Sequence, residues 1–191
     1  MIAKFDLARV LEEHGALLNG HFRLSSGRHS SQFVQKFRIL EQPVLVERVA
    51  REIIARLHPE INPNVVVSAA VGGIILGYEV ARQLGVRAIF VEKEAGTPRL
   101  RRGFVLEPGD RALVVEDVVT TGGSVREVLD VVRASGAEAV ALGVIVRREP
   151  VDFGVPTIAL LELPIASYAP EECPQCKAGE PVTEPGSRFL R

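Results

Sequence analysis

One stretch of the sequence limits the possible folds more than any other. It begins with the apolar segment Ala112–Val115, which is typical of a buried strand. Two carboxylates, Glu116 and Asp117, stand where this strand is expected to end, and a turn rich in hydroxyl groups and glycine follows. A helix pattern then runs from Ser124 to about Ser135. A strand, a loop of small residues and a helix in this order predict an anion site in an α/β protein, because backbone N–H groups and the helix N-terminus face the ligand.

The acid pair indicates which kind of anion this site would hold. Two carboxylates beside a phosphate site repel the phosphate, so another part of the ligand must account for them. Sugar hydroxyls are such a part, because carboxylates accept hydrogen bonds from them. The hydroxyl groups of Thr120, Thr121 and Ser124 add donors for the phosphate. The stretch therefore predicts a site for a ribose phosphate.

The composition fits one domain and argues against several functions. The 191 residues are 47% hydrophobic, which is enough for a single domain with a full core. A net charge of −1 gives no general attraction to nucleic acid, and no apolar run is long enough to span a membrane. Residues 1–10 carry charges throughout, unlike a signal peptide. Two cysteines make no disulfide framework, so we expect a cytoplasmic protein.

The alternation of strands and helices predicts an α/β fold with a mostly parallel open sheet flanked by helices. We expect residues 41–163 to form its core, and residues 1–40 and 164–191 to form a small hood within the same single domain, residues 1–191. The hood is predicted to contain a helix at residues 5–14 and a hairpin at residues 21–37. The predicted core elements are helices at 44–57, 74–84 and 124–135, and strands at 65–68, 88–92, 104–106, 112–115, 139–146 and 157–161.

A second strand, loop and helix occur earlier in the chain. Val65–Ser68 runs into the small residues Ala70–Gly73, and a helix pattern follows. Alone, such a loop most often only allows a helix to pack closely on the sheet. Parallel strands end at the same edge of a sheet, however, and ligands of open α/β sheets bind at that edge. We therefore expect this loop and the Thr120–Ser124 loop to serve one site.

Three other segments carry donors for an anionic ligand. Residues 93–102 are basic and predict a mobile hairpin with guanidinium groups near its tip, which is either a solvated face or a lid. Its position just before the phosphate site favours a lid. Arg147 and Arg148 follow a strand, where they could bind a carboxylate or pair with neighbouring acids. The polar turn Ser25–Ser30 is either solvated or directed at a ligand.

The stretch Val114–Ser124 resembles the phosphoribosyl-pyrophosphate (PRPP) signature of type I phosphoribosyltransferases, in which two acids and two apolar residues precede Thr-Thr-Gly-Gly-Ser. Ala70–Gly73 is similar to the pyrophosphate loop of that family, and Phe22–Ser30 resembles a segment of its members that act on orotate. The similarity covers about residues 15–160 in the expected order. It implies transfer of ribose 5-phosphate from PRPP to orotate, giving orotidine 5′-phosphate and pyrophosphate in pyrimidine (UMP) biosynthesis.

The resemblance also implies a role for individual residues. Mg²⁺ would be held through the substrate, with no direct protein ligand, and the enzyme would be a homodimer that binds neither nucleic acid nor membrane. The catalytic candidates are Glu116, Asp117, Lys93 and Arg99. The candidates for PRPP binding are Ala70, Val71, Gly72, Gly73, Lys93, Glu116, Asp117, Val118, Val119, Thr120, Thr121, Gly122, Gly123 and Ser124. The candidates for orotate binding are Ser26, Gly27, Arg28, Thr121 and Arg148.

The sequence departs from the family pattern in two places. Ser25 stands where better-known members have a lysine, and Gly96 stands where they have the principal lysine of the lid. The lid arginines could neutralise charge, but guanidinium groups are poor general acids. The residue that assists the leaving group therefore stays open, as does the choice between Arg147 and Arg148 for the orotate carboxylate.

Two other functions are alternatives to transfer onto orotate. One is transfer to a purine base, against which the Ser-Ser-Gly-Arg segment at residues 25–28 argues. The other is a PRPP-sensing regulatory protein without turnover, which usually carries a DNA-binding extension or a basic RNA face. The charge balance of the chain argues against this second alternative.

Cys173 and Cys176 have the spacing of half a zinc site. Neighbouring histidines are lacking in the sequence, so a zinc site would need a second cysteine pair from another copy of the chain. A redox pair is a further alternative. An ordinary turn or local staple is the interpretation that the sequence favours.

Overall fold

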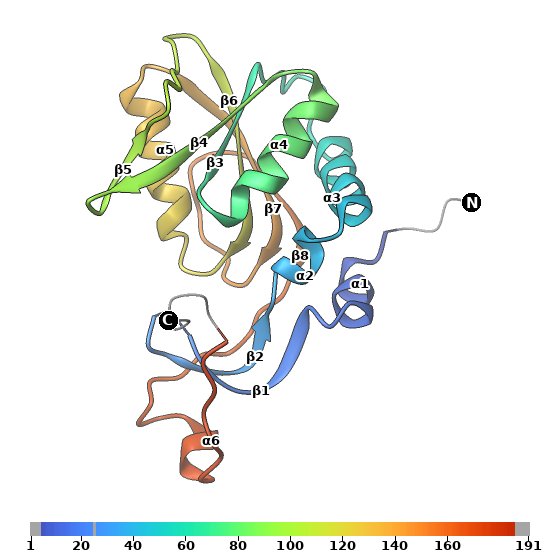
Figure 1. Cartoon of the computed structure of the whole chain (residues 1–191), viewed down its shortest axis with the longest axis vertical. Helices are drawn as coiled ribbons and strands as arrows, with labels where there is room; N and C mark the ends of the chain where they lie inside the picture. Colours follow the sequence, from blue (N-terminus) through green and yellow to red (C-terminus); the bar gives the residue numbers. More distant parts are fainter. Residues whose placement is uncertain (1–4, 25, 186–191) are drawn as a thin grey trace. The chain divides into compact units, whose positions relative to one another are not determined.

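The computed structural model describes residues 5–24 and 26–185, so the position of Ser25 lies outside the described residues (Figure 1). The chain divides into two compact units. Residues 1–5 and 40–163 form one, which we call the core unit, and residues 6–39 and 164–191 form the other, which we call the hood unit. That the two together make a single domain stays a prediction. No helix within the described ranges is long and apolar enough to cross a membrane.

The core unit is built on a six-stranded sheet in the order β5-β4-β3-β6-β7-β8. All neighbouring strands are parallel except β4 and β5, which form an antiparallel hairpin at one edge. This confirms the predicted mostly parallel α/β sheet. The strands are β3 (Val65–Ala69), β4 (Arg87–Glu94), β5 (Thr97–Leu100), β6 (Arg111–Val119), β7 (Glu138–Arg147) and β8 (Thr157–Glu162).

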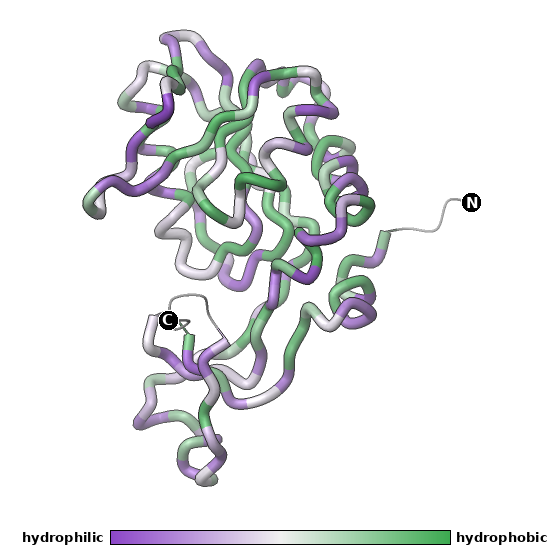
Figure 2. Tube along the Cα trace, in the orientation of Figure 1, coloured by the Kyte–Doolittle hydropathy of each residue, from purple (hydrophilic) through white to green (hydrophobic). Residues whose placement is uncertain are grey.

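Helices cover both faces of this sheet. On one face, α5 (Gly123–Ala134) packs its apolar side against alternate residues of the central strands. On the other face lie α3 (Pro43–Ala55) and α4 (Gly72–Leu84), as Figure 1 shows. Gly143 of β7 is needed for this packing, because a Cβ there would lie 2.7 Å from the side chain of Ile53 in α3. Figure 2 shows that hydrophobic residues follow the central strands, as expected for a sheet buried on both faces.

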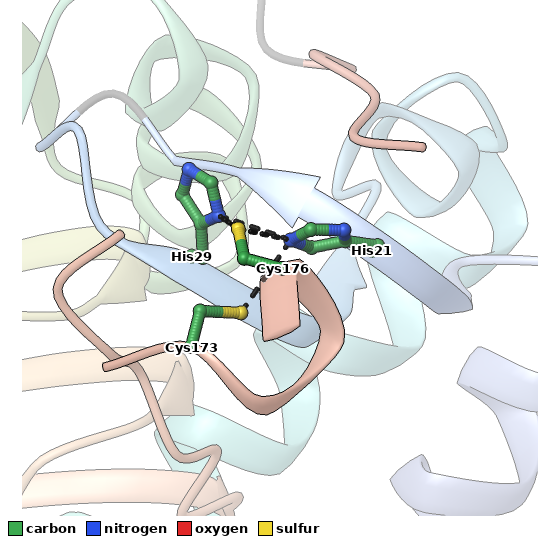
Figure 3. Close-up of side chains that lie close together, drawn as sticks. All are labelled: His21, His29, Cys173 and Cys176. Carbon is green, nitrogen blue, oxygen red and sulfur yellow. Dashed lines mark hydrogen bonds between the residues drawn. The ribbon is translucent and has the colours of Figure 1, made fainter. Parts of the chain in front are cut away.

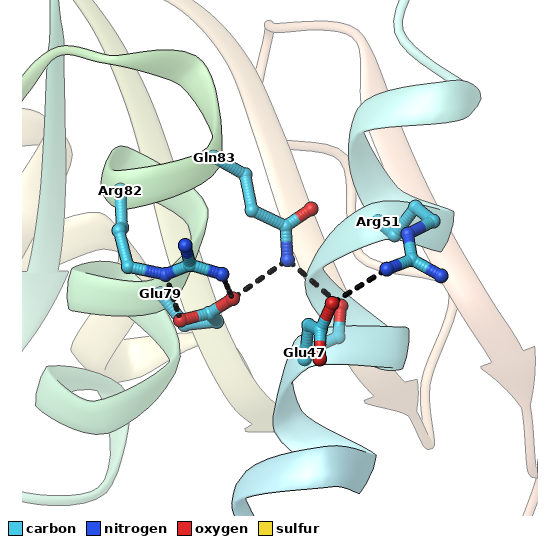
Figure 4. Close-up of polar contacts among 5 residues, drawn as sticks. All are labelled: Glu47, Arg51, Glu79, Arg82 and Gln83. Carbon is cyan, nitrogen blue, oxygen red and sulfur yellow. Dashed lines mark hydrogen bonds and ion pairs between the residues drawn. The ribbon is translucent and has the colours of Figure 1, made fainter.

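A polar network joins α3 to α4 on the outside of the core unit (Figure 4). The Gln83 amide donates to the backbone oxygen of Glu47 at 2.8 Å and to Oε1 of Glu79 at 2.7 Å. Arg82 and Arg51 pair with Glu79 and Glu47 respectively, each within its own helix. The hydrogen bonds from Arg82 lower the pKa of Glu79. Of the hydrogen bonds in this network, the one from Gln83 to Glu47 connects the two helices.

Several predicted boundaries were wrong. β6 continues past the predicted end at Val115 to Val119, because β7 pairs with it that far, whereas β3 pairs with it only to Val115. Glu116 and Asp117 therefore lie inside the strand, along a part of it that β3 no longer pairs with. Residues 104–106 form no strand. Phe37 belongs to the short helix α2 (Phe37–Leu40) instead of the predicted hairpin.

The hood unit contains a two-stranded antiparallel sheet, β1 (Leu17–Arg23) and β2 (His29–Val34), with α1 (Leu7–Glu13) before it. The C-terminal segment returns to this hairpin through isolated bridges, Phe22 with Thr183 and His29 with Tyr168. It also carries the short helix α6 (Pro174–Lys177). The expectation that Cys173 and Cys176 lack histidine neighbours is wrong, because α6 brings both cysteines next to His21 and His29.

Candidate active site

The order of strands places two glycine-rich loops side by side in the core unit. From β3 the chain moves to β4 on one side, and it later returns to β6 on the other side of β3 before continuing to β7 and β8. The direction of winding thus reverses between β3 and β6, which is the point where open α/β sheets bind ligands. The loop after β3 contains Ala70 and Val71, and the loop after β6 contains Thr120, Thr121 and Gly122. The structure therefore brings together the two loops that the sequence singled out.

Both loops lead directly into a helix that has no side-chain cap at its N-terminus. The N-cap residues are Val71 for α4 and Gly122 for α5, and neither side chain can accept a hydrogen bond. The first N–H groups of each helix thus lack the usual side-chain cap at that position and are donors for a ligand. Val71 is 73% exposed, and Thr120, Thr121 and Ser124 are exposed as well. The exposed hydroxyl donors lie around the start of α5, whereas Gly72 and Gly73 at the start of α4 are buried.

Two glycines have close-packing roles in these loops. Gly122 has a φ of +80°, and a Cβ there would lie 2.7 Å from the ring of Phe153, so both conformation and space require glycine. A Cβ on Gly73 would lie 3.1 Å from Cβ of Ser68 and 3.5 Å from Oε1 of Glu116. Gly73 thus allows the start of α4 to approach the carboxylate of Glu116 closely.

Glu116 and Asp117 are both buried, with 7% and 1% of their surface exposed. Oε1 of Glu116 accepts a hydrogen bond from the backbone N–H of Asp117 at 3.1 Å, and Oδ1 of Asp117 accepts one from the N–H of Val118 at 2.6 Å. These local bonds hold each carboxylate in one orientation. The acid pair is therefore a fixed feature at the carboxyl-terminal part of β6, just before the Thr120–Gly122 loop.

The basic segment forms a tight hairpin, with its arginines away from the predicted tip. Ala95 and Gly96 make the turn, both with positive φ, and Glu94 pairs with Thr97 across it. Arg101 and Arg102 lie beyond this turn and both form ion pairs with Glu92 of β4. The prediction of guanidinium groups near the tip is thus wrong, because cross-strand acids hold two of the arginines along the hairpin.

Lys93 and Arg99 differ in their surroundings. Lys93 lies at the carboxyl end of β4, where its Nζ pairs with Oε1 of Glu127 of α5 at 2.7 Å. Arg99 of β5 is exposed and has no ion-pair partner within residues 5–24 and 26–185. A ligand phosphate would therefore compete with Glu127 for Lys93 but meet Arg99 directly.

The two arginines after β7 have different environments. Arg147 pairs with Glu162 of the neighbouring strand β8, with an N···O distance of 2.7 Å. Arg148 is buried, its backbone N–H donates to the oxygen of Val119, and burial lowers the pKa of its guanidinium. Arg148 thus lies at the same edge of the sheet as the loop after β6, whereas Arg147 neutralises an acid of its own sheet.

In the hood unit, Ser26, Gly27 and Arg28 form the turn between β1 and β2. Gly27 has a φ of +80°, and its N–H donates to the oxygen of Leu24. The Arg28 guanidinium donates to the hydroxyl and the backbone oxygen of Ser167 in the C-terminal segment. This anchoring of Arg28 could not be predicted, because no local signal connects residues so far apart in the sequence. The ion pairs of Lys93 with Glu127 and of Arg147 with Glu162 could not be predicted for the same reason.

The match to known families defines the class of this protein. The model of the phosphoribosyl transferase domain matches residues 38–150, so the chain is a phosphoribosyltransferase-family protein. The orotate phosphoribosyltransferase of Pelotomaculum thermopropionicum is 52% identical over 187 residues, which are 97% of this chain and 98% of that protein. That of Heliobacterium modesticaldum is 53% identical over 182 residues, 94% of this chain and 95% of its own. The chain belongs to the orotate phosphoribosyltransferase family.

A solved structure agrees with this assignment. The crystal structure of orotate phosphoribosyltransferase from Aeropyrum pernix matches with a TM-score of 0.69 at 28% sequence identity. The match covers 83% of this chain and 94% of that one. The resemblance that the motifs indicated is thereby confirmed.

Proposed function

We propose that this protein transfers ribose 5-phosphate from PRPP to orotate, releasing orotidine 5′-phosphate and pyrophosphate, as a step of pyrimidine biosynthesis. The observation that carries the proposal is the buried pair Glu116–Asp117 just before the exposed residues Thr120 and Thr121, at the reversal point of the sheet. The names of relatives at about half identity over nearly the whole chain identify the acceptor base as orotate. They give no support to the purine or regulatory alternatives.

The acid pair would hold the ribose. Glu116 and Asp117 accept hydrogen bonds from the 2- and 3-hydroxyls, and the Thr120–Ser124 loop binds the 5-phosphate through its backbone N–H groups and hydroxyls. The bond to pyrophosphate breaks at the anomeric carbon, so the ring gains positive charge as in glycoside chemistry. Two fixed carboxylates beside the ring favour that charge, and no protein nucleophile is required.

The diphosphate would lie against the loop after β3. The N–H groups at the start of α4 face it, and Lys93 and Arg99 supply positive charge. Mg²⁺ prefers oxygen ligands, and diphosphate supplies them; since the acid pair is proposed to bind the ribose hydroxyls, the ion would be held through PRPP, with no direct protein ligand. When bound, Mg²⁺ would offset the charge of the departing diphosphate. Val118 and Val119 contribute to PRPP binding as the backbone that leads into the loop.

The candidates for recognising the base form two groups, one in each unit. In the core unit, Arg148 binds the orotate carboxylate and Thr121 contacts the base. Arg147 forms an ion pair with Glu162, which supports Arg148 as the residue that binds the carboxylate. For the hood unit, contact of Ser26, Gly27 and Arg28 with the pyrimidine ring stays a prediction from the family resemblance. The expected homodimer and cytoplasmic location are part of the same proposal.

Depletion of the base tests the proposed activity. Purified protein is incubated with PRPP, Mg²⁺ and, in separate reactions, orotate, adenine, hypoxanthine or uracil. Orotate should disappear and orotidine 5′-phosphate should form, with no change in the other bases. Asp117→Asn protein purified in the same way controls for host enzymes. Consumption of a purine without consumption of orotate would refute the proposal.

A further inference from the structure

We propose that the hood unit contains a structural zinc site made by His21, His29, Cys173 and Cys176 of one chain (Figure 3). The four side chains come from three elements: His21 from β1, His29 from β2, and both cysteines from α6 and its N-cap. One ligand atom of each lies within 4.8 Å of all the others. His21, His29 and Cys173 are buried. None of these four residues is among those proposed to bind PRPP or orotate, although His29 directly follows Arg28 in the chain.

The distances between these atoms fit tetrahedral coordination of one ion. Nε2 of His21 lies 3.5 Å from Sγ of Cys173 and 3.6 Å from Sγ of Cys176, and Nδ1 of His29 lies 3.2 Å from Sγ of Cys176. Zn–S and Zn–N bonds of about 2.3 and 2.0–2.1 Å at tetrahedral angles place S and N ligands about 3.6 Å apart. The two nitrogens are 2.9 Å apart, against about 3.3 Å in that geometry. Every pair of ligand atoms lies within 4.8 Å, so small movements of the four side chains would close the set around one ion.

Hydrogen bonding alone does not account for this arrangement. Nδ1 of His21 lies 2.9 Å from the backbone oxygen of Glu180, which can only accept, so Nδ1 carries a proton. In neutral histidine, Nε2 then has a single lone pair, yet it faces a nitrogen and two sulfurs within 3.6 Å. A cation at the centre would use the lone pairs of all four atoms at once. The bond to the Glu180 oxygen is also the usual second contact of a metal-binding histidine.

The chemistry of the ligands favours zinc over other ions. Two thiolates and two imidazoles in a closed tetrahedral set are typical of structural Zn²⁺ sites. A two-iron cluster with the same residue types would place the histidine pair and the cysteine pair on different irons. The short N···S distances across the pairs exclude that spacing. A disulfide between Cys173 and Cys176 would leave the two converging histidine nitrogens unexplained.

The backbone around the site is shaped to bring the ligands together. The register of β1 and β2 shifts between Asn19 and Phe22, where Gly20 and His21 of β1 face one residue of β2, so β1 carries a bulge there. A bulge changes the direction of nearby side chains, and this one directs His21 toward α6. Within residues 164–185, Ile165 and Cys173 are the only buried residues. A segment with so little core needs another source of stability, and a metal that links it to the hairpin would supply one.

Metal content of the untagged, full-length protein tests this proposal. The wild type, purified under reducing conditions, should hold about one Zn²⁺ per chain by mass spectrometry, as expected for a closed four-ligand site. Cys176→Ser should lose the metal. Cys176 is the exposed ligand, so its replacement disturbs the packing least, and circular dichroism checks the fold. His58→Gln, which changes an exposed histidine of the core unit, should retain full zinc content.

A second measurement keeps the test independent of how the variant folds. Wild-type protein is stripped with a chelator and titrated with Co²⁺, which should give the visible absorption bands of a tetrahedral thiolate complex that Zn²⁺ then abolishes. The thiols should react with a thiol reagent only after metal removal. A wild type that neither contains nor takes up more metal than Cys176→Ser, or whose two cysteines form a disulfide under the same conditions, would overturn the proposal.

Discussion

Asp117 is the residue on which the proposed chemistry depends most. Its side chain is 1% exposed, and burying a carboxylate costs free energy unless its charge is satisfied. The N–H of Val118 satisfies part of it, through a bond that also fixes the side-chain direction. A fixed, buried negative charge beside an open phosphate loop is what stabilisation of a positively charged sugar requires.

Replacing Asp117 with Asn tests this role while keeping the shape of the side chain. Loss of its charge should lower kcat by more than tenfold, which corresponds to about 1.4 kcal/mol of barrier. Asp130→Asn removes an exposed carboxylate from α5 as a matched control and should leave kcat unchanged. Steady-state kinetics with PRPP as the varied substrate makes the comparison. Full activity of Asp117→Asn would show that the ribose assignment is wrong.

Arg148 and Arg147 are adjacent, yet they should respond differently to substitution. Arg148→Ala should raise KM for orotate about tenfold or more and KM for PRPP much less, because it removes a charged hydrogen bond to the base. Arg147→Ala should change both constants little, since Arg147 is paired with Glu162. Both variants are compared at saturating concentrations of the other substrate, with thermal melts as a check on folding. The reverse pattern would assign the carboxylate to Arg147.

Among the elements, the turn before β6 shows how charge fixes a strand next to the site. Oδ2 of Asp110 accepts from Arg87 of β4 at 2.7 Å and from the N–H of Glu107 at 2.8 Å. Burial by itself raises the pKa of Asp110, but these hydrogen bonds, the positive charge of Arg87 and a hydrogen bond with Asn64 together outweigh it, and the pKa is lowered. The turn that starts β6 is thus tied to the strand two positions away in the sheet.

This lowered pKa predicts how stability depends on pH. A carboxyl whose pKa is lower in the folded state stabilises the fold above its unfolded pKa, about 3.9, and loses that effect as pH falls through the folded value. Asp110→Asn should therefore reduce the free energy of unfolding at pH 7 by about 1–3 kcal/mol. The difference from wild type should shrink in acid. Urea unfolding at several pH values measures it, and a difference that grows toward low pH would contradict the assignment.

At the scale of the whole molecule, the fold class and the two loops of the core unit could be predicted from the sequence. Strand periodicity and small residues are local signals, so Val65–Gly73 and Val114–Ser124 could be recognised directly. The end of β6 could not, because its last residues are strand only through pairing with β7. The partners of the arginines also depend on which strands become neighbours.

The proposed zinc ligands show more clearly that contacts between residues far apart in the sequence cannot be predicted from local patterns. His21 and Cys176 are 155 positions apart, so spacing could identify the cysteine pair but not the histidines. Only the return of the C-terminal segment to the β1–β2 hairpin brings them together. The sequence therefore supplied half of this candidate site.

Removal of the metal should affect the two units differently. Chelation should increase amide hydrogen exchange in residues 164–185 and in β1 and β2, because the metal cross-links these segments. Exchange in β3, β6 and β7 should change little, since their core contains none of the ligands. Exchange monitored by mass spectrometry with and without chelator compares the segments. Equal increases in all strands, or no increase in the hood segments, would contradict this expectation.

The most direct test of the central claim is a competition for limiting PRPP. Orotate, adenine, hypoxanthine and uracil are supplied together at equal concentrations with Mg²⁺, and the nucleotides formed are identified by mass spectrometry. The proposed function predicts orotidine 5′-phosphate as the product, with pyrophosphate in equal amount, and less than a tenth as much of both from Asp117→Asn in the initial phase of the reaction. A purine nucleotide as the main product, or no nucleotide from any base while PRPP stays bound, would contradict it.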